Sequence, residues 1–197
     1  VRQKNVKNIM LKNILDACGG AIGFWTLGYG FAYGDHSKTD FFIGTSAFAY
    51  LADGKSDGDQ ADGYSYIAWF FQFAFAATAA IIVAGTVAER CKMSAYLCYS
   101  IFLTAFVYPV VVHSIWCTDG WLSAFIDEEE ALYGVGVIDF AGSGVVHMTG
   151  GATAPVAAII LGPRKGRFYD DDGNALETPG SFPPHSVALQ VLGTFIL

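Results

Sequence analysis

The chain has 197 residues, of which 53% are hydrophobic and only 15% are charged, and its mean hydropathy is +0.41. This composition is too apolar for an ordinary soluble domain, and the apolar residues come in long blocks instead of the stripes of amphipathic helices or strands. The formal net charge of -7 gives no basis for nucleic-acid binding, which needs a basic surface. The sequence therefore predicts an all-α fold, a polytopic transmembrane helical bundle that lies in a lipid bilayer.

Taken in chain order, the apolar blocks predict four complete membrane helices and one incomplete helix. The expected helices cover residues 14–34, 64–88, 93–117, 139–163 and 184–197. Residues 35–63 form an acidic loop, and its apolar piece, residues 41–52, is too short to span and is expected at the interface. The last block would end inside the bilayer with unsatisfied carbonyl groups, so we expect residues 1–197 to be one transmembrane domain cut from a longer protein.

The loop charges predict an orientation. Basic residues occur in the N-terminal flank, around Arg90 and after Arg164, whereas the two intervening loops are acidic. Loops rich in Lys and Arg stay on the cytoplasmic side of a membrane. The N-terminal flank is therefore expected in the cytoplasm, which places Trp116 and Asp139 at the outer face.

The fourth block holds one titratable residue, His147, within residues 140–163, where Asp, Glu, Lys and Arg do not occur. On a regular helix, the positions three, four and seven residues away are nearly all small: Phe140, Ser143, Gly144, Gly150, Gly151 and Ala154. An ionisable side chain at this depth predicts a functional role. Asp139, at the mouth of the block, is expected to cap the helix, to belong to the site, or both, and Pro155 can kink the inner half.

Further candidate site residues lie along the same outer mouth. Gln72 and Phe75 are three residues apart and share a helix face, and Trp116 ends its own block. An aromatic face near a carboxylate attracts a small cation by ~0.5–2 kcal/mol per ring. Taken singly, Trp116 also fits an interfacial belt, Phe75 fits helix packing, and His113 fits an interfacial hydrogen bonder. No metal site is expected: the cysteines lack CxxC spacing, and a site formed by His113, Cys117, Asp139 and His147 is disfavoured.

Three stretches resemble the ammonium transporter (Amt/Mep/Rh) superfamily, most closely its plant- and alga-like branch. They are IDFAGSGVVHMTGG (138–151), FQFAFAATAAIIVAGTVAER (71–90) and GPRKGRF (162–168), and the similarity extends over essentially the whole chain. The resemblance implies a fold of eleven transmembrane helices in two inverted halves, assembled as a homotrimer with one pore per subunit. This chain would hold the second to fifth helices and the start of the sixth.

The resemblance also implies roles for individual residues. Phe75 matches the outer ring of a stacked phenylalanine gate, and Trp116 matches the aromatic wall of an outer ammonium site. Asp139 matches the carboxylate that supports this site and the backbone at residues 141–142. His147 matches the first of two pore histidines. The second gate phenylalanine, a serine of the outer site and the second histidine would follow Leu197.

The function implied by this resemblance is transport across the plasma membrane, without a cofactor and without enzymatic catalysis. Ammonium, or methylammonium as an analogue, would be bound at the outer site and deprotonated, and ammonia would cross the pore. The alternative is an ammonium sensor that uses the same site for signalling. A membrane-embedded metalloenzyme is disfavoured, because it would need a cluster of metal ligands.

Overall fold

The computed structural model describes residues 1–35, 42–50 and 63–196. These residues lie in helices and loops, with two isolated β-bridges, so the predicted all-α class is confirmed. The main helical elements are α1 (Val6–Gly23), η2 (Phe24–Gly28), α2 (Tyr29–Tyr33), α3 (Gly63–Val87), α4 (Met93–Phe102), η4 (Leu103–Val107), α5 (Tyr108–Trp116), η6 (Ser143–Met148), α6 (Thr149–Leu161) and α7 (Val187–Ile196). The predicted acidic loop falls largely on residues 36–41 and 51–62, outside the described part. Its apolar piece is described over residues 42–50, which include the short helix η3 (Phe48–Tyr50), and its place at the interface stays a prediction.

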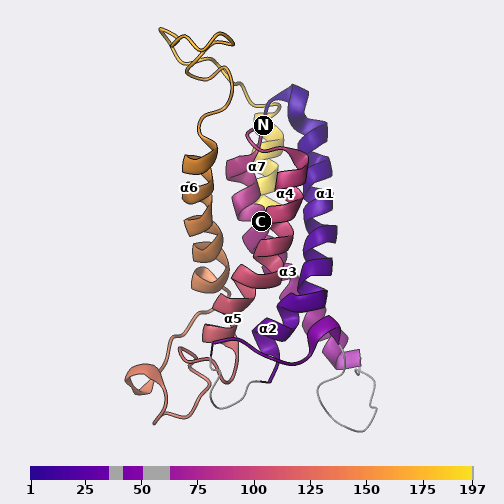
Figure 1. Ribbon diagram of the computed structural model, residues 1–197, viewed down its shortest axis with the longest axis vertical. Coiled ribbons are helices and arrows are strands. Elements are labelled where there is room, and N and C mark those ends of the chain that lie inside the picture. Colours follow the sequence, from indigo (N-terminus) through magenta and orange to yellow (C-terminus); the bar gives the residue numbers. More distant parts are fainter. Residues whose placement is uncertain (36–41, 51–62, 197) are drawn as a thin grey trace.

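Several of these elements join into long helical runs (Figure 1). In the described part, three stretches are long and apolar enough to cross a membrane: Tyr66–Val87, Met93–Trp116 and Ser143–Leu161. They fall within the second, third and fourth predicted blocks. A helix satisfies its own backbone hydrogen bonds, which is why long uncharged blocks become helices in lipid.

The first helical run begins at Val6, so the predicted start at residue 14 was too late. The basic flank was excluded from the helix because of its charge. Lysine is nevertheless a good helix former, and Lys12 is only 5% exposed because its Nζ donates a hydrogen bond to the carbonyl of Cys91 at 2.6 Å. A tertiary contact thus draws this lysine into the bundle.

The remaining predicted boundaries differ by smaller amounts. The fourth run begins at Ser143 instead of residue 139, and the last helix begins at Val187 instead of residue 184. Pro183 and Pro184 precede the last helix, and proline disfavours helical geometry in the residue before it. None of the residues of α7 is buried.

The core forms around α3, which packs against α1 on one side and α6 on the other (Figure 1). Ala76, Ala79 and Ala80 of α3 are fully buried. A Cβ atom at Gly150 would lie only 2.8 Å from the carbonyl oxygen of Ala79, so α3 and α6 approach through small residues. Small side chains let membrane helices pack closely, and this contact holds α6 beside α3.

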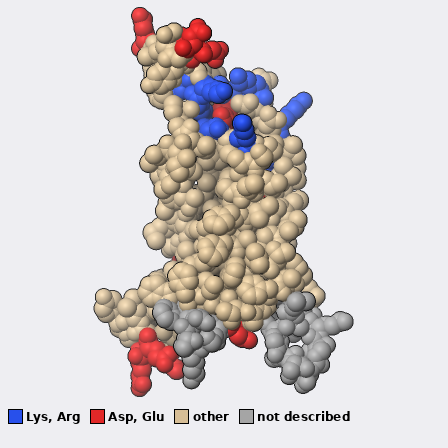
Figure 2. All heavy atoms as spheres, viewed as in Figure 1, with Lys and Arg blue, Asp and Glu red and all other residues tan. Residues whose placement is uncertain are grey.

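The charged residues separate to the two ends of the molecule. Figure 2 shows basic groups gathered at the end where the N-terminus lies, and acidic groups at the opposite end and at the tip of the loop after α6. That tip carries Asp170, Asp171 and Asp172, beyond the basic residues next to the helix end. Because positive charges close to a span determine its orientation, this arrangement supports the predicted cytoplasmic N-terminal flank.

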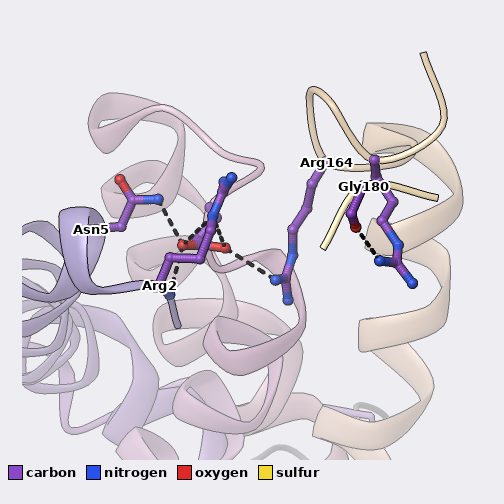
Figure 3. A network of polar contacts seen from close by, with 6 residues as sticks. Arg2, Asn5, Arg164 and Gly180 are labelled. Atoms are coloured by element: carbon purple, nitrogen blue, oxygen red, sulfur yellow. Dashed lines mark hydrogen bonds and ion pairs between the residues drawn. The ribbon is translucent and has the colours of Figure 1, made fainter. Parts of the chain in front are cut away.

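A buried carboxylate joins three segments at the basic end (Figure 3). Glu89, in the turn between α3 and α4, has a fully buried side chain. It accepts hydrogen bonds from Asn5 Nδ2 at 2.6 Å, from Arg2 N at 3.0 Å and Nε at 3.2 Å, and from Arg164 Nη1 at 3.0 Å. Burial opposes ionisation, but the hydrogen bonds from Asn5 and Arg2 outweigh it and lower the pKa of Glu89 to about 2.

Candidate functional site

The structure brings together three of the predicted site residues from segments far apart in sequence. The rings of Phe75, on α3, and Trp116, at the end of α5, meet edge to face with centroids 5.3 Å apart and an interplanar angle of 72°. The indole Nε1 of Trp116 donates to the backbone carbonyl of Asp139 at 3.0 Å. Trp116 is half-buried, so it links the two neighbours and is not merely a belt residue facing lipid.

The carboxylate of Asp139 caps the helix that carries His147. Its Oδ2 accepts hydrogen bonds from the backbone N–H groups of Gly144 at 3.1 Å and Val145 at 2.6 Å, and its Oδ1 accepts one from the Ser143 hydroxyl at 3.1 Å. These N–H groups start a helix and have no partner within it. The predicted capping role is confirmed, and the negative charge lies where the helix dipole favours it.

A sharp turn separates Asp139 from this helix. Ala141 has φ +60° and Gly142 has φ +87°, so the chain enters the left-handed region before η6 begins. Phe140 lies before the turn and is 90% exposed. The expectation that Phe140 shares a helical face with His147 is therefore wrong, because residues 140–142 are not helical.

We expect Gly142→Ala to destabilise the protein by ~2 kcal/mol, because an L residue at this φ is strained. A Cβ at Gly142 would also lie 2.5 Å from Cγ2 of Val146 and 3.3 Å from Cη2 of Trp116. Thermal unfolding in detergent measures the effect. Gly151→Ala is the matched control, since no atom lies within 4 Å of its Cβ position and alanine favours a helix. Equal melting temperatures for the two variants would contradict the prediction.

His147 lies on a π-helical turn, which the sequence did not predict. The carbonyl of Gly142 accepts hydrogen bonds from the N–H groups of Val146 at 3.0 Å and His147 at 2.9 Å, so the turn holds one residue more than an α-helical turn. Nδ1 of His147 lies 3.2 Å from the same carbonyl. If Nδ1 carries the ring proton and donates a hydrogen bond to this carbonyl, Nε2 keeps its lone pair and can accept a hydrogen bond. The side chain is exposed.

Gln72 lies one turn before Phe75 on α3, as predicted. Its Oε1 is buried without a hydrogen-bond partner among the described residues. An unsatisfied amide oxygen at this position is available to accept a hydrogen bond from a cationic ligand or water. Its place in the outer site stays a prediction.

One expectation about a neighbouring residue is corrected. His113 is fully buried, and its Nδ1 lies 3.1 Å from the carbonyl of Ala32, so it anchors α5 to α2 instead of facing an interface. Pro155 lies inside α6, which is helical from Thr149 to Leu161. A membrane helix tolerates proline where neighbours support the freed backbone groups.

No metal centre is evident in the part of the chain that the structure describes, where no three His, Cys, Asp or Glu side chains are grouped for one. Both carboxylate oxygens of Asp139 already accept hydrogen bonds from the start of η6. The arrangement offers an aromatic pair, Phe75 and Trp116, beside the capped Asp139, which suits a small cation.

Comparison with known proteins decides the family. The model of a protein family described as Ammonium Transporter Family matches residues 1–197, the whole chain. The chain belongs to the ammonium transporter family. The family predicted from the sequence motifs is thereby confirmed. As a member of this family with several apolar helices, the chain is a multi-pass integral membrane protein.

Relatives of this family member cover the whole chain. It is 50% identical over 197 residues to putative ammonium transporter 1 member 5 of Arabidopsis thaliana and to ammonium transporter 1 member 1 of Oryza sativa subsp. japonica. Among solved structures, it is 33% identical to a protein described as Sensor Amt Protein, with a TM-score of 0.76 and 45% of that chain covered. The chain spans 37% of the length of the two plant relatives.

Proposed function

We propose that this chain forms the outer ammonium-binding site and the adjoining pore segment of a plasma-membrane ammonium transporter. The single observation that carries the proposal is the position of Trp116, whose ring contacts Phe75 and whose indole N–H holds the backbone of Asp139. This contact connects an aromatic surface to the only acidic side chain between the outer loop and His147 in sequence. The 50% identity to plant ammonium transporters supports the assignment.

In this proposal, the outer site selects a small cation. The electron-rich faces of Trp116 and Phe75 attract ammonium by ~0.5–2 kcal/mol per ring. Asp139 adds a negative charge but has its oxygens occupied by the start of η6, so it acts by positioning the turn and by its field. Gln72, with its unpartnered amide oxygen, is the proposed hydrogen-bond acceptor one turn from Phe75 on α3.

Deprotonation follows from the cost of moving charge through the membrane. A charged group at mid-membrane depth is strongly disfavoured, whereas neutral ammonia is not. His147, with Nδ1 held by the carbonyl of Gly142, presents Nε2 as an acceptor toward the transported species. We propose that ammonium near the Phe75 ring gives up its proton, that Nε2 of His147 accepts and relays this proton, and that ammonia crosses, in one pore of each subunit of a homotrimer.

A second candidate function is ammonium sensing by the same site. The similarity to the solved Sensor Amt Protein favours it specifically, at a TM-score of 0.76. The two functions differ in whether substrate crosses the membrane. The deciding experiment is ammonium-evoked current in cells expressing the full-length protein, with potassium as control, together with uptake of labelled methylammonium. A saturable ammonium signal establishes transport, and the absence of both current and uptake favours sensing.

His147→Ala is expected to lower ammonium current and methylammonium uptake at least tenfold, because the acceptor Nε2 is removed from the pore segment. Surface expression and assembly are expected to remain unchanged, since the side chain is exposed in this part of the protein. His185→Ala, at an exposed loop position, is the matched control and is expected to transport normally. Normal transport by a well-expressed His147→Ala protein would contradict the proposed role.

A further inference from the structure

A cavity of about 360 Å³ opens at the basic end of the molecule, beside the loop that follows α6. It is lined by arginine, proline and phenylalanine side chains: Arg90, Pro163, Arg164, Arg167, Phe168 and Phe182. Half of this lining is cationic, and none of it is acidic. This composition differs from the aromatic outer site, which lies at the opposite end of the helices.

The arginines of the cavity keep donors free for a ligand. Arg90 donates one hydrogen bond, from Nη1 to the carbonyl of Gly162 at 3.3 Å, and its Nε is buried without a partner in the described structure. Arg167 donates from Nη1 to the carbonyl of Gly180 (Figure 3). These carbonyl partners fix the direction of each guanidinium but do not neutralise its charge. A guanidinium has five N–H donors, so most remain available.

The positive charges at this site are only partly compensated. The guanidinium carbons of Arg2, Arg164 and Arg167 lie 3.9, 5.9 and 5.8 Å from the centroid of the Phe182 ring. One carboxylate, Glu89, forms ion pairs with Arg2 and Arg164. Among the described residues, two of these three cations thus share one carboxylate, and like charges gathered around one ring repel one another. A second anion in the cavity would reduce this repulsion.

Nearby acidic residues do not supply that anion. Asp170 and Asp171 line an adjoining cavity, which shares Pro163 and Arg164 with the first. Asp170 accepts hydrogen bonds from the backbone N–H groups of Asp172 at 3.0 Å and Asn174 at 2.7 Å, which hold its carboxylate within its own loop. The arginine cavity is therefore open to an external anion.

The depth of the cavity indicates which anion reaches it. Pro163 directly follows Gly162, the residue that caps the end of α6, and Arg90 follows shortly after α3 ends at Val87. Both helices contain candidate membrane spans. The polar layer of a leaflet is roughly 5–8 Å thick, so the cavity lies at headgroup depth. The cytoplasmic leaflet, to which the basic end is assigned, carries the anionic lipids.

We propose that this arginine cavity binds the phosphate of an anionic phospholipid headgroup. Arginine pairs with phosphate through parallel N–H···O bonds that match its planar fork, and these bonds are strengthened by charge. Phe182 and Pro163 provide an apolar wall beside the phosphate, next to where the acyl chains begin. The site is separate from the ammonium pathway, and the proposal does not depend on transport.

The test is lipid binding by the purified full-length protein in nanodiscs of phosphatidylcholine with and without phosphatidic acid, followed by native mass spectrometry of retained lipid. We expect the double variant R90Q/R167Q to lower the apparent affinity for phosphatidic acid at least tenfold. The matched control K4Q/K7Q removes two exposed charges from the same end, outside this cavity, and is expected to change affinity less than twofold. R90K/R167K retains the charges but not the planar fork, so it is expected to recover only part of the binding, and this partial recovery guards against a loss of fold.

Each outcome decides the proposal. Equal losses in R90Q/R167Q and K4Q/K7Q would assign the binding to diffuse surface charge and overturn the site. Unchanged binding by R90Q/R167Q would also overturn it. A parallel titration with inorganic phosphate separates the sources: displacement of phosphatidic acid only at much higher phosphate concentration supports a lipid site. Equally tight binding of free phosphate would overturn the lipid assignment in favour of a soluble phosphate ligand.

Discussion

Asp139→Ala is expected to abolish ammonium transport and to destabilise the protein by about 1–3 kcal/mol. The destabilisation follows because the N–H groups of Gly144 and Val145 and the hydroxyl of Ser143 lose their acceptor. Transport is expected to fail because the turn before η6 then loses the side-chain bonds that fix it to the start of this helix, so the Asp139 backbone is no longer positioned for the Trp116 indole. Methylammonium uptake and the melting temperature in detergent measure the two effects.

Asp139→Asn separates the capping role of this residue from its charge. The amide oxygen can still accept from the helix start, so the melting temperature is expected to stay within a few degrees of the wild type. The negative charge is lost, and uptake is expected to fall at least tenfold if the field of Asp139 attracts the cation. Normal uptake by a stable Asp139→Asn protein would show that Asp139 serves only as a cap.

Glu89→Ala is expected to lower the melting temperature by about 10 °C. Removing one partner of a buried ion pair leaves the other charges unpaired, at a cost of about 3 kcal/mol, and each kcal/mol shifts a protein of this size by roughly 2–4 °C. The charges left behind belong to Arg2 and Arg164. Glu129→Gln, in the exposed acidic loop at the other end, is the control and is expected to melt as the wild type does.

The same residue gives the wild type a defined acid sensitivity. The pKa of Glu89 is lowered from 4.5 to about 2 in the folded protein, so its ionised form stabilises the fold fully above the unfolded value. This contribution is lost as the pH falls from 4.5 toward 2. The melting temperature of Glu89→Gln is expected to lack this component of the decline. Parallel decline of both proteins over this range would contradict the assignment.

The sequence by itself determined the membrane class, three of the long apolar helices and the family. These features are local: a block without charged residues must form a helix in lipid, since no solvent there satisfies the backbone. The capping role of Asp139 was also visible, because the carboxylate and the start of its helix are neighbours in the chain. The roles of Phe75, Trp116 and His147 in transport remain proposals.

Only the tertiary structure decided how these parts meet. Trp116 reaches the backbone of Asp139 across a long loop, and no local pattern encodes that hydrogen bond. The burial of Lys12 and His113 depends on carbonyl groups of a distant turn and of another helix, which is why their charge or position near a helix end was misleading. The π-helical turn at His147 arises because the carbonyl of Gly142 takes two N–H groups after a left-handed turn. Hydropathy measures how apolar a segment is, whereas such contacts depend on which polar groups the folded bundle brings within hydrogen-bonding distance.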